Sequence, residues 1–337
     1  MTVGLDIGSK TIKIVEVEKQ GNNFTLKGSG VVGYSGLSIE NMKDEKEYVQ
    51  LADTIKKLCK ETRISKKDVV LSLPENQVFT RIVRFPLLTD QEIDSAVKWE
   101  AEQYIPIPIS EAVVQHQILE RKELSSPPEV VVLLIAVQQV LVEKYVRLLQ
   151  MAGLSISAVE TELLAASRVL APADQTVMLV DFGAVSTDIA IVKNGNLVFS
   201  RSVPSAGDSL TRAVSQSIGV DALQAEEYKK TYGMSPEQLE GKVMQSILPV
   251  YNLIVDEIRK AIQFYQTDEK DGKPTQVIVV GGAAGLPGMS TKLAEDLGME
   301  VIMGNPFQKV TVAPEVYKQI ANYAPLYAIA VGLALRG

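Results

Sequence analysis

The chain has 337 residues, and its 34 Lys and Arg against 41 Asp and Glu give a net charge of −7. This length fits two domains of roughly 100–200 residues, the 46% apolar residues suffice for two packed cores, and a surplus of acids without a basic arm argues against an extended nucleic-acid interface. The single His and single Cys exclude a multi-histidine metal site, a thiolate metal cluster, a disulfide and an ordinary His-based triad, so chemistry must come from carboxylates, hydroxyls, backbone amides and a hard cation such as Mg²⁺.

The first part of the chain is predicted to form a three-stranded meander. Apolar runs predict strands at 3–7, 12–18 and 24–33, separated by turns at 8–10 and 21–23. A helical period of apolar residues follows over 45–62, and residues 68–73 return as a strand. This order of elements is the first unit of the fold.

Residues 78–155 are predicted to be an insertion with elements of its own. The expected elements are strands at 79–85, 112–120 and 130–136 and helices at 89–104 and 140–151. A Thr-Asp-Gln-Glu capping box at 89–92 predicts where the first of these helices begins. We expect a compact subdomain here.

The order of the first unit then returns. Strands are expected at 176–181, 187–193, 196–202 and 276–280, with helices near 205–218 and 221–232. Each meander opens with a strand that ends in Asp-hydrophobe-Gly, at 6–8 and again at 181–183. Two similar halves that face each other form a cleft, and the repeated turns would project into it.

Targeting signals are not expected in this sequence. The N-terminus lacks the basic stretch and long apolar run of a secretory signal. The longest apolar segment, 324–335, is shorter than the roughly 20 residues that cross a bilayer, so we interpret it as a buried helix. Both observations predict a cytoplasmic protein.

The first turn has the composition of a phosphate-binding turn. Gly8, Ser9, Lys10 and Thr11 follow the acid Asp6 and offer backbone N–H groups and hydroxyls at one point. Asp6 is a candidate to hold Mg²⁺ through water. Taken alone, an ordinary hairpin whose Gly supplies a positive φ explains this turn as well.

A second copy of the turn favours the phosphate interpretation. Asp181 is followed by Gly183, Ala184, Ser186 and Thr187, again an acid, a glycine and hydroxyls. A third motif, at 277–288, is a buried strand that opens into a glycine-rich turn with candidate ligand-facing glycines at Gly281, Gly282 and Gly285. It has neither the P-loop lysine ending nor the dinucleotide glycine spacing.

The three motifs, in this order, resemble those of the actin-like ATPase superfamily over nearly the whole chain. Residues 5–11 resemble its first phosphate motif, 179–191 its second and 277–289 its adenosine motif. The resemblance implies an α/β actin-like ATPase fold, with two related halves around a nucleotide cleft that holds ATP and Mg²⁺. Asp6 and Asp181 would then be the metal-side residues.

The resemblance also implies roles for residues outside the three motifs. Gly207 and Asp208 resemble a turn that touches the phosphates, and Glu226 and Lys229 resemble the pair that holds ribose and base. Glu162, which fits better than Glu160, would stand on the first connecting helix and position water as the catalytic residue. Departures from the family pattern at 184–186 and 285 predict slow hydrolysis at most.

Within the superfamily, the insertion resembles that of FtsA and of the PilM family of type IV pilus assembly proteins. The implied division is 1–77 with 156–172 as the first half, 78–155 as an FtsA-type inserted subdomain and 173–337 as the second half. The helix end at 99–106 and the closing pattern at 330–336 resemble the PilM family. An amphipathic C-terminal membrane helix, as in FtsA, is not expected.

The PilM resemblance implies a pilus adaptor that serves pilus biogenesis and twitching motility. The N-terminal cytoplasmic peptide of a PilN-like inner-membrane protein would dock at the inserted subdomain and place the protein at the inner face of the inner membrane, with PilO and the motor ATPases as indirect partners. The sequence leaves open whether the protein forms a homo-oligomer. The alternatives are an FtsA-like cell-division protein and a slow ATPase or small-molecule kinase of the same fold.

Overall fold

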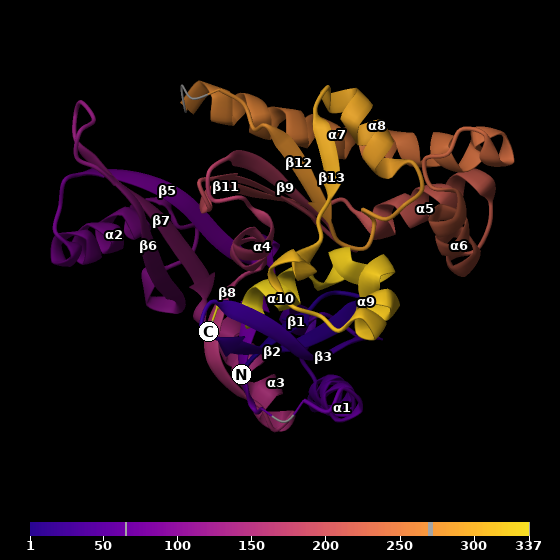
Figure 1. Ribbon diagram of the computed structural model, residues 1–337, viewed down its shortest axis with the longest axis horizontal. Coiled ribbons are helices and arrows are strands. Elements are labelled where there is room, and N and C mark those ends of the chain that lie inside the picture. Colours follow the sequence, from indigo (N-terminus) through magenta and orange to yellow (C-terminus); the bar gives the residue numbers. More distant parts are fainter. Residues whose placement is uncertain (65, 269–271, 337) are drawn as a thin grey trace.

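Two five-stranded sheets with the same strand pattern carry the two halves of the chain (Figure 1). The computed structural model describes residues 1–64, 66–268 and 272–336. The first sheet has the order β3-β2-β1-β4-β8, built from β1 (Thr2–Ile7), β2 (Thr11–Gln20), β3 (Asn23–Gly33), β4 (Asp68–Leu73) and β8 (Ser155–Thr161). The second has the order β11-β10-β9-β12-β13, built from β9 (Thr176–Phe182), β10 (Thr187–Lys193), β11 (Asn196–Val203), β12 (Gln276–Val280) and β13 (Glu300–Met303).

In both sheets an antiparallel meander continues into parallel strands. β1 pairs antiparallel with β2 and parallel with β4, and β9 pairs antiparallel with β10 and parallel with β12. The matching topology confirms the predicted repeat and the α/β fold class. It also brings the acid-glycine ends of β1 and β9 to equivalent places in the two halves.

Helices cover the sheets and supply most of each core. The first sheet is covered by α1 (Glu45–Glu61) and α3 (Gln139–Met151). The second half carries α5 (Gly207–Ile218), α6 (Ala222–Tyr232), α7 (Lys242–Asp268) and α8 (Met289–Leu297), while α9 (Pro314–Ile320) lies near the C-terminus. None of the helices in the described ranges is long and apolar enough to cross a membrane.

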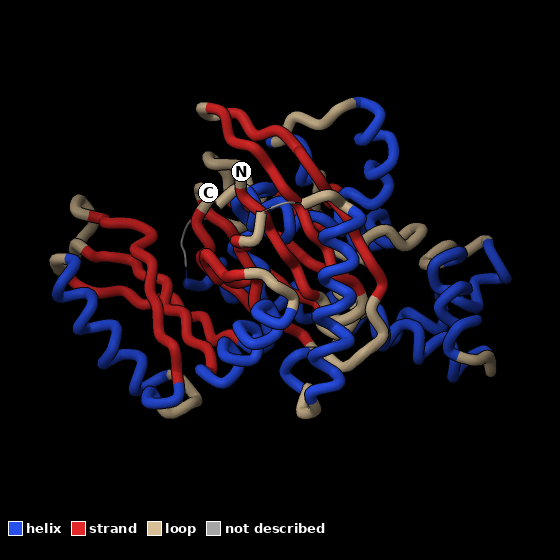
Figure 2. The backbone as a smooth tube through the Cα atoms, turned by 90° about the horizontal axis from the view of Figure 1, so that it is seen from below, coloured by secondary structure: helices blue, strands red, loops and turns tan. Residues whose placement is uncertain are grey.

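The inserted subdomain is a three-stranded sheet with one helix on its face. The order is β5-β7-β6, from β5 (Val78–Pro86), β6 (Ala112–Lys122) and β7 (Glu129–Gln138), and α2 (Asp90–Tyr104) lies along the sheet (Figure 2). The predicted capping box is present, since Thr89 accepts a hydrogen bond from the backbone N–H of Glu92. Ile93, Val97 and Ala101 of α2 pack into a core that belongs to this subdomain.

Helix α3 packs elsewhere than the sequence suggested. Residues 140–151 were expected inside the insertion, but Leu141, Tyr145 and Leu148 are buried in the same core as Val3 and Leu5 of the first sheet. The apolar face of α3 is matched by the first sheet and α1, which offer a larger apolar surface than the three-stranded sheet. The domain boundaries themselves stay a prediction.

Two short helices join the halves at the centre of the molecule. They are α4 (Glu162–Leu170) and α10 (Ala328–Ala334), and their backbones touch, because a Cβ added at Gly332 would lie 1.9 Å from the carbonyl oxygen of Ala165. Only a residue without a side chain fits there. The predicted buried helix over 324–335 is therefore a connecting element, of which 328–334 is α-helical.

Candidate functional site

A buried ion pair between Asp6 and Lys13 lies at the base of the first turn, which joins β1 and β2. The backbone N–H of Gly8 donates to the carbonyl oxygen of Thr11 at 3.1 Å, which closes the turn. Asp6 is 1% exposed and Lys13 8% exposed, and the ammonium of Lys13 donates to the Asp6 carboxylate at 2.9 Å. Burial disfavours the ammonium, but the Asp6 carboxylate outweighs it and raises the pKa of Lys13.

Lys13 was not among the residues predicted for the site. It lies directly opposite Asp6 in the register of β1 and β2. The signal was present in the sequence, because a hairpin closed at 8–10 pairs residue 6 with residue 13. A buried ammonium at the base of the first turn adds a positive charge beneath the backbone N–H groups of the turn.

The second turn, between β9 and β10, repeats the geometry with different side-chain roles. Gly183 donates its N–H to the carbonyl oxygen of Ser186 at 3.0 Å. The hydroxyl of Ser186 donates to Asp188 at 2.9 Å, and the fully buried Thr187 donates its hydroxyl to the carbonyl oxygen of Ser205 at 2.7 Å. Both predicted hydroxyls are therefore engaged within the second half, and the turn offers mainly its backbone.

Carboxylates gather between the two turns. Burial, with the neighbouring charge of Asp188, raises the pKa of Asp181 to about 7. Burial, with Asp6, raises the pKa of Glu162 well above its ordinary value. Asp181 and Glu162 both act on Lys13, so the ends of β1, β9 and α4 converge on one ammonium.

The donor set fits a cation that is held through water. Within the described residues, Asp6 and Asp188 each keep one buried carboxylate oxygen without a hydrogen-bond partner. Over the same ranges, no three His, Cys, Asp or Glu side chains form a group that could hold a metal ion directly. Such an arrangement matches Mg²⁺, which keeps several of its waters and uses only one or two carboxylates.

The N-terminus of α5 is fastened to the second turn. Gly207 donates its N–H to the carbonyl oxygen of Gly183 at 3.1 Å, and Asp208 donates to that of Ala184 at 2.8 Å. On the outer side, the ammonium of Lys10 and the carboxylate of Asp208 form a partly exposed ion pair at 3.2 Å. Lys10 and Asp208, both predicted site residues, thus bridge the two halves.

Glu226 and Lys229 form a pair beneath this N-terminus. Lys229 is 5% exposed and donates to Glu226 at 2.6 Å, to the hydroxyl of Thr211 and to the carbonyl oxygen of Gly207 at 3.0 Å. Burial opposes the charge of Glu226, but hydrogen bonds from Lys229 and Thr211 prevail and lower its pKa to about 2. Lys229 supports the turn from below, and Glu226 is the more accessible partner.

The glycine-rich turn after β12 touches the second turn. Gly281 has φ +86°, and a Cβ there would lie 2.2 Å from a carboxylate oxygen of Asp181. Ala283 donates its N–H to the carbonyl oxygen of Phe182 at 3.1 Å. Gly282 lies beside Leu326, and no heavy atom within the described ranges lies within 4 Å of a Cβ placed on Gly285, so the outer part of this turn is open.

The structure distinguishes Glu162 from Glu160. Glu160 is bound by both guanidinium nitrogens of Arg168, at 2.5 and 2.6 Å. Glu162, at the start of α4, accepts the backbone N–H of Glu75 at 3.2 Å and feels the charges of Asp6 and Asp181. Glu162 is therefore the acid that faces the turns.

Comparisons with known proteins agree with this geometry. The family model described as type IV pilus assembly protein PilM matches residues 4–337. The solved PilM-PilN type IV pilus biogenesis complex is 31% identical, with a TM-score of 0.86 over 99% of this chain and 98% of the matched chain. The structure of MreB 5 from Spiroplasma citri bound to AMPPNP is 13% identical, with a TM-score of 0.56 over 99% of this chain and 95% of that one, and shares the fold. Cell division protein FtsA of Staphylococcus epidermidis is 23% identical over 95% of this chain and 77% of its own length.

Proposed function

The chain belongs to the family of type IV pilus assembly protein PilM, and from this premise we propose that it is a nucleotide-binding adaptor of type IV pilus assembly. The match to the solved PilM-PilN complex over nearly the full length of both chains carries this proposal. The alternative of an FtsA-like division protein is not proposed, because FtsA is a more distant relative. An actin-like fold with a small insertion provides a cleft and a separate docking surface.

The partner is the N-terminal cytoplasmic peptide of a PilN-like inner-membrane protein, which docks at the inserted subdomain. The insertion has a core of its own, so the part of its surface that does not pack on the second half can serve a partner while the two halves form the cleft. This peptide holds the adaptor at the inner face of the inner membrane. PilO and the motor ATPases are indirect partners, which interact with the adaptor through the same assembly.

The cleft between the two turns holds ATP with Mg²⁺. We expect the backbone N–H groups at 9–10 and 184–185, which do not close the two turns, and the partly exposed ammonium of Lys10 to meet the phosphates, with the ammonium of Lys13 beneath the first turn. Asp6 and Asp181 hold the cation through water, and the bound cation neutralises phosphate charge. The positive charge of the cation would also offset the repulsion among the buried carboxylates of Asp6, Asp181 and Glu162.

Turnover is slow at most. A general base must be ionised to take a proton from water. Glu162 is placed as that base would be, but burial and the charge of Asp6 raise its pKa well above the ordinary range, which disfavours the ionised form that a base needs. The site therefore binds nucleotide better than it hydrolyses it.

We expect the purified protein to bind Mg·ATP saturably and to hydrolyse it far more slowly than the roughly 1 s⁻¹ of an ordinary slow enzyme. Calorimetry and phosphate release measure the two properties on the same sample. Asp181→Ala should abolish binding, whereas Asp256→Ala, on the exposed face of α7, should not. Rapid turnover that Asp181→Ala removes would contradict an adaptor.

A further inference from the structure

Glu75 is a buried acid at the root of the inserted subdomain. It opens the 3-10 helix η2 (Glu75–Gln77), which lies between β4 of the first sheet and β5 of the insertion. Glu75 is only 4% exposed. An acid in this position is expensive to bury, so it calls for a role beyond packing.

Glu75 and the start of α4 are joined by reciprocal hydrogen bonds. The backbone N–H of Glu75 donates to the carboxyl of Glu162 at 3.2 Å, and the backbone N–H of Leu163 donates to the carboxyl of Glu75 at 3.4 Å. Asp188 of β10 faces the same carboxyl, and burial together with this neighbouring acid raises the pKa of Glu75 to about 7. Glu75 thus contacts α4, which bears Glu162, and interacts electrostatically with Asp188 of β10, the strand that follows the second turn.

The insertion meets the second half next to Glu75 through polar contacts and a shared apolar core, in which Leu133 of β7 is buried together with Leu179 and Val192 of the second sheet. The hydroxyl of Thr80 in β5 is hydrogen-bonded to that of Ser200 in β11, and the side chain of Asn196 donates to the carbonyl oxygen of Leu119 in β6 at 3.4 Å. A displacement of β10 and β11 therefore also moves the insertion, near the point where β5 leaves the first half. These two strands belong to the second half, which a nucleotide in the cleft would draw toward the first half.

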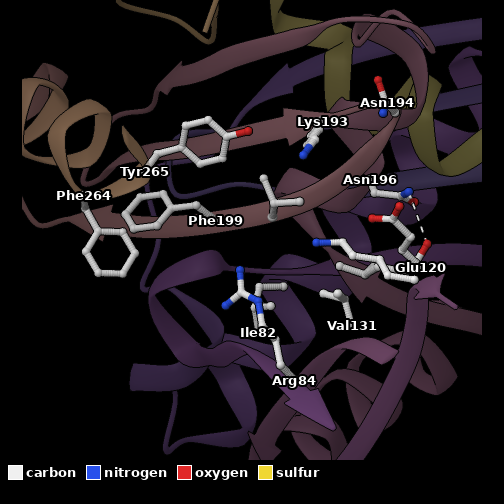
Figure 3. A pocket seen from close by; sticks show the side chains of 13 residues that line it. Ile82, Arg84, Glu120, Val131, Lys193, Asn194, Asn196, Phe199, Phe264 and Tyr265 are labelled. Atoms are coloured by element: carbon white, nitrogen blue, oxygen red, sulfur yellow. Dashed lines mark hydrogen bonds between the residues drawn. The ribbon is translucent and has the colours of Figure 1, made fainter. Parts of the chain in front are cut away.

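Beyond these contacts a cavity of about 240 Å³ lies between the insertion and the second half (Figure 3). Arg84 and Ile82 of β5 face it from the insertion, and Phe199 and Phe264 face it from the second half. Phe264 is 58% exposed. The cavity opens only part of this boundary, because Ile82 and Leu133 of the insertion belong to an apolar core that is shared with the second half.

We propose that Glu75 is the positioning residue through which the nucleotide cleft and the inserted subdomain influence each other. Glu75 is hydrogen-bonded to the start of α4, and its 3-10 helix continues directly into β5 of the insertion. A nucleotide that draws the two turns together shifts β10 and β11 relative to α4, and the Thr80–Ser200 contact passes this shift to the insertion. The inference rests on the proposed function, because it takes the cleft and the insertion as the two binding sites.

The test is the ratio of two affinities for a synthetic peptide with the sequence of the PilN-like partner's cytoplasmic N-terminus. Calorimetry gives the peptide Kd with and without saturating Mg·ATP, and we expect the two to differ about tenfold in the wild-type protein. In Glu75→Ala the ratio should fall to within about twofold of one. Asn76→Ala changes an exposed side chain of the same turn and should keep the tenfold ratio.

Two further variants protect the test against a folding defect. Glu75→Gln keeps an oxygen that accepts the N–H of Leu163 and should retain most of the ratio. Thr80→Val removes the hydroxyl that meets Ser200 and should lower the ratio toward one without touching the cleft. Urea unfolding of each variant checks that it stays fully folded under the titration conditions, where a loss of stability alone changes neither peptide affinity.

The outcomes separate this inference from the proposed function. If the wild-type protein binds both ligands but Mg·ATP does not alter the peptide Kd, or if Glu75→Ala keeps the ratio, the coupling role is refuted and the adaptor stands. If the wild-type protein binds neither ligand, the proposed function fails and the inference falls with it. A ratio near ten that Glu75→Ala and Thr80→Val both abolish supports it.

Discussion

Asp6→Ala is expected to lower the free energy of unfolding by about 3 kcal/mol, at the lower end of the range for breaking a buried ion pair. The substitution leaves the ammonium of Lys13 buried without its partner at 2.9 Å. Asp181 and Glu162 also attract Lys13, which keeps the loss from being larger. Urea unfolding followed by circular dichroism measures the change.

The control is an exposed ion pair of the same residue types. Asp53 and Lys56 lie on the surface of α1, with side chains 63% and 51% exposed, and Asp53→Ala should change stability by less than about 0.5 kcal/mol. The double variant Asp6→Leu with Lys13→Met should recover part of the loss, because it leaves no buried charge unpaired. A loss below about 1 kcal/mol for Asp6→Ala would show that the pair is not buried in solution.

The part of the Asp6→Ala effect that comes from the Lys13 ion pair should not depend on pH in the neutral range. The folded protein raises the pKa of Lys13 above its ordinary 10.5, so the stabilisation is fully present below 10.5 and is lost only as the pH rises through the folded value. Asp6 also raises the pKa of Asp181 and of Glu162, so its removal relieves repulsion once these acids ionise, and urea unfolding should show a smaller loss of stability at about pH 9 than at about pH 6.

Asp181→Asn is expected to stabilise the nucleotide-free protein at pH 8 by about 2 kcal/mol and to weaken Mg·ATP binding on the order of 10–100-fold. Burial and the charge of Asp188 raise the pKa of Asp181 from 3.8 to about 7. A shift of about three units corresponds to about 4 kcal/mol, and partial exposure of the side chain reduces this by about half. Asparagine fills the same space without the charge.

The pH dependence follows from the direction of this shift. Below the unfolded pKa of 3.8 both states are protonated, and between 3.8 and about 7 the folded state binds more protons, so wild-type stability falls as pH rises through that window. Asp181→Asn should make this slope less steep, leaving the parts due to Glu75, Glu162 and Asp188, whose pKa values burial also raises. Asp256→Asn on α7 serves as the matched control and should change neither property. Destabilisation at pH 8 with unchanged Mg·ATP affinity would exclude Asp181 from the site.

The repeated turns could be predicted because each motif is local. An acid at the end of an apolar strand followed by Gly and hydroxyls is visible at Asp6 and again at Asp181, and β-sheet topology places both at equivalent strand ends. The capping box at Thr89 is local in the same way, and α2 begins where it indicates. Patterns that depend on residues close in sequence are readable without coordinates.

The remaining parts of the site depend on contacts between distant segments. Glu75 lies 87 residues from Glu162 in the chain, and no local pattern connects them. The engagement of Thr187 with Ser205, the support of Gly207 by Lys229 and the packing of α3 on the first sheet arise only from tertiary structure. The periodicity of α3 predicted an amphipathic helix but could not show which sheet it covers.

The central claim is that this member of the PilM family acts as an adaptor for a PilN-like membrane protein. The most direct measurement is a calorimetric titration of the full chain with a synthetic peptide of that protein's cytoplasmic N-terminus, against a scrambled peptide of equal composition. We expect saturable one-to-one binding of the native peptide and none of the scrambled one. Equal binding of both peptides, or no saturation below roughly 1 mM, would contradict the claim.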